Sequence, residues 1–110
     1  MGRPISWFEI CSPRHEELRS FYADLFDWAV TPLPVMDYAL VDTGGPIGGG
    51  ITSGEDEVVV YVEVDDLDAA LRRVRAAGGI AGVAERKPYG LKAECEDDQG
   101  VVFELWQPSD

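Results

Sequence analysis

Three segments of the chain place a carboxylate two residues from an aromatic side chain. The pairs are Trp7 and Glu9, Tyr61 and Glu63, and Glu104 and Trp106. Residues two apart lie on the same face of a β-strand. Aromatic rings beside carboxylates attract organic cations through cation–π contacts and charge-assisted hydrogen bonds, and a carboxylate at a substrate can also act as a general base. The spacing therefore predicts a ligand-binding or acid–base site.

The intervening positions of the same segments are apolar. They are Phe8, Ile10, Val60, Val62, Val64, Val101, Phe103 and Leu105. A slip of one residue would bury the carboxylates under a helix, at a cost of several kcal/mol each. The alternation thus predicts three strands with one apolar face and one face that carries the acids.

Other reactive side chains are sparse. His15, the single histidine, is expected at the exposed start of a helix, which disfavours a Ser-His-Asp or Cys-His nucleophile. Cys11 and Cys95 lack the C-x-x-C spacing of redox and zinc motifs, so both are expected to be reduced and packed. Gly48-Gly49-Gly50 lacks the Lys and Ser or Thr of a phosphate loop. We expect those glycines in a strand that another backbone or a ligand approaches closely.

The net charge of −12 excludes several partners. Both halves of the chain are acidic, and such a field repels phosphate backbones and anionic lipid. We therefore expect no nucleic-acid and no membrane partner. We find neither a signal peptide nor an apolar run of membrane-spanning length, so a cytoplasmic location is expected.

The first half of the chain predicts the element order βαβββ. Ser12 is expected to cap the first helix, with Pro13 at its first position. The buried stripe of this helix is predicted as Leu18, Phe21, Tyr22, Leu25 and Phe26. Strands are expected at 5–11, 27–31, 37–41 and 47–52.

The second half repeats this order. A strand over 57–64 leads into a helix that Asp65 or Asp66 caps and Gly78-Gly79 ends. Leu67, Ala70, Leu71 and Val74 form its apolar stripe. Three further strands are expected at 80–85, 91–96 and 101–106, the last two joined by a turn at Asp97–Gly100. The chain thus predicts one domain, 1–110, made of two modules at about 4–54 and about 55–108.

Four segments carry a family resemblance. They are ISWFEI at 5–10, EELRSFYADLFDW at 16–28, VEVDDLDAAL at 62–71 and DQGVVFEL at 98–105. With the duplication, they resemble the glyoxalase, bleomycin-resistance and extradiol-dioxygenase superfamily, also called the vicinal oxygen chelate fold. The resemblance implies an α+β fold in which two tandem βαβββ modules form a curved, half-open, eight-stranded mixed sheet.

Enzymes of this family hold a divalent metal with one side chain from the first and one from the last strand of each module. Carried over to this chain, those positions fall on Trp7, near Thr52, on Val59 and on Glu104. Glu104 alone is a ligand type, whereas a catalytic metal needs at least three protein donors. We therefore expect no metal or other cofactor. The alternative is a displaced Mg²⁺ or Mn²⁺ site made of Glu9, Glu63 and Glu104.

The resemblance also implies a cavity lined by the strand faces that point away from the helices. The residues expected there are Trp7, Glu9, Cys11, Val59, Tyr61, Glu63, Glu94, Val102, Glu104 and Trp106. Lys92 can face the same way, and Tyr38, Leu40 and Tyr89 are further candidates.

Two classes of function fit this lining. The first is a metal-independent, homodimeric binding protein that sequesters or carries an aromatic or cationic compound such as an antibiotic, as in the bleomycin-resistance branch. The alternative is an enzyme: a metal-free isomerase, epimerase or cyclase with Glu104 or Glu9 as the base, or a divalent-metal lyase or dioxygenase.

Overall fold

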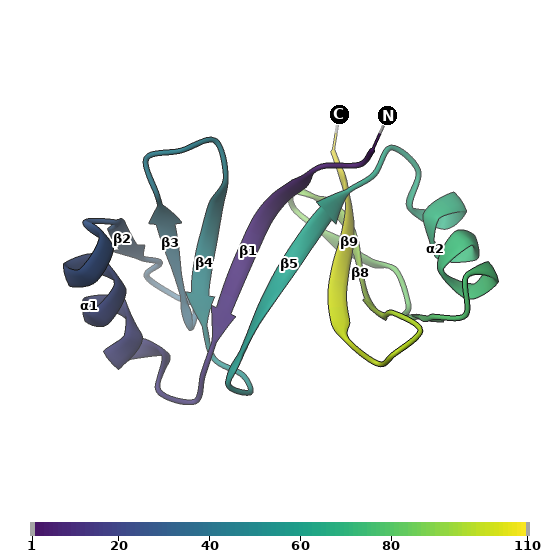
Figure 1. Ribbon diagram of the computed structural model, residues 1–110. Helices are drawn as coiled ribbons and strands as arrows, with labels where there is room; N and C mark the ends of the chain where they lie inside the picture. Colours follow the sequence, from purple (N-terminus) through teal and green to yellow (C-terminus); the bar gives the residue numbers. More distant parts are fainter. Residues whose placement is uncertain (1, 110) are drawn as a thin grey trace. The chain divides into compact units, whose positions relative to one another are not determined.

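The computed structural model describes residues 2–109 (Figure 1). Within that range the chain forms two helices and nine strands. In order they are β1 (Ile5–Cys11), α1 (His15–Phe26), β2 (Ala29–Pro32), β3 (Tyr38–Asp42), β4 (Gly48–Thr52), β5 (Glu57–Glu63), α2 (Leu67–Ala76), β6 (Ile80–Ala81), β7 (Glu85–Lys87), β8 (Gly90–Glu96) and β9 (Val102–Pro108). No helix in this range is long and apolar enough to cross a membrane.

The chain divides into two compact units. We call Ser6–Val59 the N-terminal unit, and Val60–Ser109 together with residues 2–5 the C-terminal unit. Residues 2–5 are held in the C-terminal unit because the Pro4 carbonyl accepts a hydrogen bond from the Glu63 amide at 2.9 Å. The Arg3 guanidinium also lies 2.7 Å from the Asp65 carboxylate.

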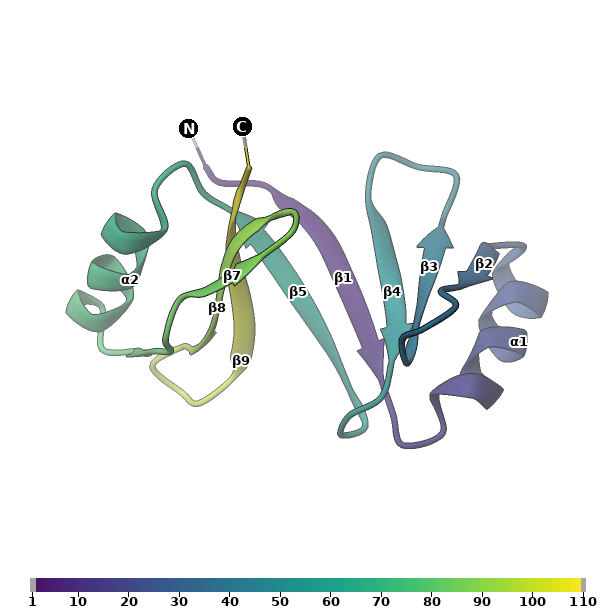
Figure 2. The ribbon, with the colours of Figure 1, turned by 180° about the vertical axis from the view of Figure 1, so that it is seen from behind.

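Each unit pairs its strands in the same way. In the N-terminal unit the order is β2-β3-β4-β1, with β1 and β4 parallel and the other pairs antiparallel. In the C-terminal unit it is β5-β9-β8-β6, with β5 and β9 parallel, and β7 pairs with β8 beside β6 (Figure 2). Each sheet is mixed and each unit carries one helix, so the predicted α+β class is confirmed.

One predicted strand is divided in two. The segment expected to run over 80–85 forms β6 and the separate β7, which gives nine strands instead of eight. Gly82 lies between them with its Cα against the Glu94 carbonyl of β8, so close that a side chain would clash.

The core of the C-terminal unit lies between α2 and one sheet face. Leu67 and Leu71 of α2 pack with Val64, Ala93, Cys95 and Leu105, all at most 7% exposed. Asp66 caps the helix as predicted, since its carboxylate accepts the Ala69 amide at 3.1 Å.

The glycine end of α2 is also as predicted. The Gly79 amide donates to the Val74 carbonyl at 3.0 Å and the Gly78 amide to the Arg75 carbonyl at 3.1 Å. Gly78 has φ 92°, the left-handed conformation that ends a helix in this motif.

The start of α1 differs from the prediction. Ser12 does not cap it: the helix begins at His15, preceded by a turn. The Ser12 hydroxyl accepts the Arg14 amide at 3.1 Å and donates to the Asp56 carboxylate at 2.8 Å. It therefore holds the end of β1 to the segment before β5 and leaves the first turn of α1 without a side-chain cap.

The predicted stripe of α1 is only partly buried. Leu18 and Tyr22 pack against the core residues Ile10, Val41 and Ile51. Phe21, Leu25 and Phe26 are more than half exposed. Phe21 and Phe26 contact the ring of Tyr22, at centroid distances of 5.1 and 6.1 Å, instead of the sheet. The prediction that all five residues are buried was therefore wrong: only Leu18 and Tyr22 of the five pack against this core.

The three glycines of β4 make room for aromatic rings. A side chain at Gly49 would overlap the ring of Phe8, and one at Gly50 would overlap the ring of Tyr38. At Gly48 a β-carbon would lie 3.1 Å from the Trp7 ring. Close approach is therefore present, but aromatic side chains of the same unit make it instead of the backbone or ligand that was expected.

Gly50→Ala should lower the free energy of unfolding by about 1–3 kcal/mol, because the Tyr38 ring must leave its position. Urea unfolding followed by circular dichroism would measure the loss. Gly45→Ala is the matched control, since a β-carbon there meets only the Thr43 hydroxyl at 3.7 Å. Equal stability of the two variants would contradict the close packing of Tyr38.

Candidate functional site

The acid-bearing face of the C-terminal unit is built by strand register. Tyr61 of β5 lies opposite Glu104 of β9, and Lys92 of β8 lies opposite Trp106. Glu85 of β7 lies opposite Lys92. Neighbouring residues of β8 and β9 point to the α2 core, so alternation turns these side chains to the other face. Four strands thus contribute to one polar row.

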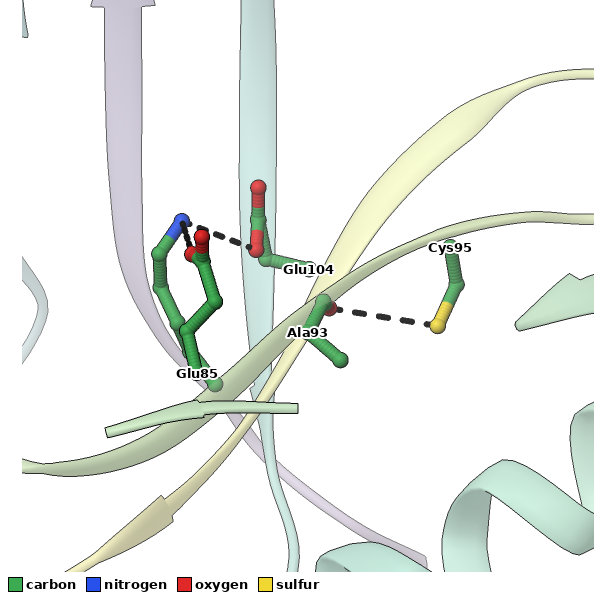
Figure 3. A network of polar contacts seen from close by, with 5 residues as sticks. Glu85, Ala93, Cys95 and Glu104 are labelled. Atoms are coloured by element: carbon green, nitrogen blue, oxygen red, sulfur yellow. Dashed lines mark hydrogen bonds and ion pairs between the residues drawn. The ribbon is translucent and has the colours of Figure 1, made fainter. Parts of the chain in front are cut away.

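A buried ion pair forms the centre of this row. The Lys92 ammonium lies 3.4 Å from a Glu104 carboxylate oxygen and 3.8 Å from one of Glu85. The Glu104 side chain is 7% exposed and that of Lys92 18%, whereas Glu85 is 57% exposed. Figure 3 shows the two carboxylates directed at one nitrogen and Cys95 on the opposite side of the strand.

Aromatic rings border the ion pair. The Lys92 ammonium lies 5.9 Å from the centre of the Tyr61 ring, and Tyr61 is 4% exposed. Trp106 meets Tyr89 edge to face, with ring centroids 5.8 Å apart. The face therefore combines a compensated charge pair with three aromatic side chains.

The ammonium keeps its proton in this setting. Burial lowers the pKa of Lys92, but the charge of Glu104 and its hydrogen bond to Lys92, with further contributions from Tyr89 and Glu85, outweigh burial and raise the pKa from its ordinary value of 10.5. Lys92 is thus a fixed cation at neutral pH.

Energetics argue against a purely structural purpose for this pair. Removing two charges from water costs several kcal/mol for each ion, and well-packed apolar residues often serve stability equally well or better. A buried pair on a sheet face next to half-buried aromatic rings is therefore a candidate ligand site.

The N-terminal unit carries the remaining aromatic and acidic positions. The Trp7 indole N–H donates to the Tyr38 hydroxyl at 2.9 Å. Trp7 lies opposite Gly48, and Glu9 lies opposite Gly50. Both side chains are partly buried. Tyr38, a minor candidate in the sequence, is thus a direct partner of Trp7.

The other predicted lining residues vary in exposure. Val59 is buried, Glu63 and Val102 are half-buried, and Glu94 is exposed. Glu94 lies opposite Glu104, and Glu63 lies opposite Trp106. Of the predicted site residues, the C-terminal unit brings together Tyr61, Glu63, Glu94, Val102, Glu104 and Trp106. Trp7, Glu9 and Val59 belong to the N-terminal unit.

Sequence reasoning missed the partners of Glu104. Lys92 was expected on this face, but its ion pair with Glu104 was not foreseen, and Glu85 was not considered. The alternation of Lys92 with Glu94 was the available signal. Which of them reaches Glu104 depends on the register between β8 and β9.

The residues at the family's metal-ligand positions do not fit a metal. Trp7, Thr52 and Val59 offer no suitable donor set, and the carboxylate of Glu104 is engaged by the Lys92 ammonium. Within residues 2–109 no three His, Cys, Asp or Glu side chains are grouped to hold a metal ion. The displaced site of Glu9, Glu63 and Glu104 remains a prediction.

The expected exposure of His15 was wrong. The residue is 8% exposed, and its Nδ1 atom is buried without a hydrogen-bond partner in the described part of the chain. Cys95 is buried in the core, and this burial raises the pKa of its thiol. Between residues 2 and 109, neither Cys11 nor Cys95 is part of a disulfide.

Lys92→Met should destabilise the protein by about 3–5 kcal/mol at neutral pH, because it leaves the buried Glu104 carboxylate without its cation. The raised pKa of Lys92 means that its stabilisation is present below pH 10.5 and is lost as the pH rises through the folded-state value. The difference between wild type and variant should therefore shrink above pH 10.5 in urea unfolding experiments.

Glu85→Gln is the control for this measurement, because an exposed partner contributes at most about 1 kcal/mol. A Lys92→Met variant as stable as Glu85→Gln would show that the central pair contributes little.

Comparison with known proteins supports the fold. No family model matches the chain. The anthracycline biosynthesis protein DnrV of Streptomyces peucetius is 26% identical over an alignment of 130 positions, gaps included, that covers 96% of this chain and 47% of that protein. The chain thus spans about half the length of this curated relative.

Two solved structures match nearly the whole chain. Methylmalonyl-CoA epimerase from Mycobacterium tuberculosis has a TM-score of 0.73 at 20% identity, covering 96% of this chain and 88% of that one. A glyoxalase/bleomycin resistance protein/dioxygenase superfamily member from Vibrio splendidus 12B01 has a TM-score of 0.69 at 17% identity, covering 96% and 99%. The resemblance found in the sequence is therefore confirmed: the chain has the fold of the glyoxalase, bleomycin-resistance and dioxygenase superfamily.

Proposed function

We propose that the chain is a metal-independent binding protein for an aromatic small molecule, held on the acid-bearing face of the C-terminal unit. The observation that carries this proposal is the buried ion pair of Glu104 and Lys92 beside aromatic rings. Ligand sites combine apolar and aromatic surface with a few placed polar groups. Trp106 and Tyr89 supply the aromatic surface, and the ion pair supplies the polar groups.

The similarity to DnrV supports an aromatic ligand. That relative is described as an anthracycline biosynthesis protein, and anthracyclines are polycyclic aromatic compounds. A compound of this kind could stack on Trp106 or Tyr89. Sequestering or carrying such an antibiotic is the specific activity we propose, and action as a homodimer remains a prediction from the family resemblance.

A second candidate is a metal-free acid–base enzyme such as an isomerase, epimerase or cyclase. It is favoured by the 3.4 Å separation of a carboxylate and an ammonium, because Glu104 could serve as the base while the Lys92 ammonium stabilises negative charge that develops on the ligand. Glu104 is the proposed base, and Glu9 remains the alternative. A divalent-metal lyase or dioxygenase is less well supported, because the residues at the family's ligand positions do not fit a metal.

Binding of an anthracycline aglycone, the polycyclic aromatic part without its amino sugar, should change the intrinsic Trp fluorescence of the protein. Trp106→Ala should weaken the binding at least tenfold, the typical effect of removing a central aromatic anchor. Trp28→Phe is the matched control, since Trp28 packs into the core of the N-terminal unit. Trp7→Ala would show whether Trp7 contributes as well. Absence of saturable binding to wild-type protein, or equal affinity of Trp106→Ala, would contradict the proposal.

Incubation of the bound anthracycline in D₂O distinguishes the two candidates. A binding protein should return the compound with unchanged mass. A base at Glu104 should exchange an acidic C–H for deuterium, and Glu104→Gln should abolish that exchange. Mass spectrometry of the recovered compound measures the outcome, and exchange that persists in Glu104→Gln would exclude Glu104 as the base.

A further inference from the structure

We infer that the ligand is an aromatic compound that carries an ionised oxygen, a carboxylate or a phenolate, and that the Lys92 ammonium binds this oxygen. The inference rests on the proposed function and specifies its ligand class. It revises the expectation from sequence, in which the carboxylates favoured a cationic compound. The revision follows from the position of Lys92.

The place of a cation beside Glu104 is already taken. The Lys92 ammonium lies 3.4 Å from Glu104 and 5.9 Å from the centre of the Tyr61 ring. These are the carboxylate and the aromatic face that would recognise an organic cation. The Lys92 ammonium repels a cationic ligand from this position. The same charge attracts an anionic oxygen.

Lys92 has the capacity for another hydrogen bond. An ammonium has three N–H donors, and in the described residues Glu104 and Glu85 are the two carboxylates paired with it. Both distances, 3.4 and 3.8 Å, exceed the roughly 2.7–2.9 Å of tight charge-assisted bonds. With the Lys92 side chain 18% exposed, a donor can reach a ligand oxygen.

Strand register places an aromatic platform next to this donor. Lys92 lies directly opposite Trp106, and Trp106 contacts Tyr89 edge to face. Side chains at opposite positions of neighbouring strands lie about 4.5–5.5 Å apart at their β-carbons. A ring that stacks on Trp106 therefore brings its substituent to Lys92.

The other carboxylates of this face restrict where the anion can lie. Glu104 is compensated by Lys92, and the repulsion from Glu85 is reduced because that side chain is 57% exposed to water. Glu63 lies opposite Trp106, and Glu94 lies opposite Glu104. Both carboxylates repel an anion, whereas the Lys92 ammonium attracts one, so the oxygen is expected at Lys92.

Three probes of one shape and different charge test the inference. They are 2-naphthoate, 2-naphthylmethanol and 2-naphthylmethylammonium, titrated into wild-type protein at neutral pH by isothermal calorimetry. We expect 2-naphthoate to bind most tightly, at least tenfold more tightly than the ammonium compound. Lys92→Met should abolish or invert this order, Lys92→Arg should retain it, and Glu85→Gln should strengthen binding of 2-naphthoate.

The outcomes separate the inference from the proposed function. If the ammonium compound binds more tightly than 2-naphthoate, the inference is overturned, whereas the proposed binding of an aromatic compound is still supported. Binding of none of the probes would count against both, whereas anthracycline binding that depends on Trp106 would then support the function alone. A Lys92→Met variant that keeps the naphthoate preference would overturn the role of Lys92. If that variant does not fold, the order of the three affinities for the wild-type protein tests the inference by itself.

Discussion

A carboxylate buried in a sheet needs a cation beside it, and the C-terminal unit is arranged around this requirement at Glu104. The pairing of β8 with β9 brings the Lys92 ammonium to 3.4 Å, and the pairing of β7 with β8 adds the exposed carboxylate of Glu85. On the reverse of the same strands, Ala93, Cys95 and Leu105 form the core with α2. One register therefore sets both the polar row and the apolar core, and a shift of one residue would exchange them.

The N-terminal unit satisfies a different constraint with the same strand pattern. Its sheet accommodates the rings of Trp7, Phe8 and Tyr38 by omitting side chains over Gly48–Gly50. Trp7 and Tyr38 are then joined by a hydrogen bond, which provides the indole N–H with the partner that it needs when partly buried. The two units thus share a topology but differ in their sheets. The sheet of the C-terminal unit carries a buried ion pair, and that of the N-terminal unit carries aromatic rings packed over glycines.

Local signals explain which features could be predicted from sequence. The cap at Asp66 and the glycine end of α2 depend on neighbouring residues, and Phe103 and Leu105 of β9 face the core as the alternation of that segment predicts. Features that depend on distant segments were missed. Ser12 bonds to Asp56 instead of capping α1, the segment expected as one strand divides around Gly82, and Lys92 reaches Glu104 through the register between β8 and β9. The types of residue at the candidate site were therefore predictable, whereas their electrostatic pairing was not.

The course of the first residues limits how this chain can be divided. Residues 2–5 are held in the C-terminal unit through the Pro4 carbonyl, while the chain from Ser6 onward belongs to the N-terminal unit. A fragment that starts at Val60 would lack the acceptor of the Glu63 amide and the partner of Asp65. The two units are consequently not two consecutive stretches of the sequence. Cutting the chain in the connection before β5 would separate residues 2–5 from the C-terminal unit, in which they pack.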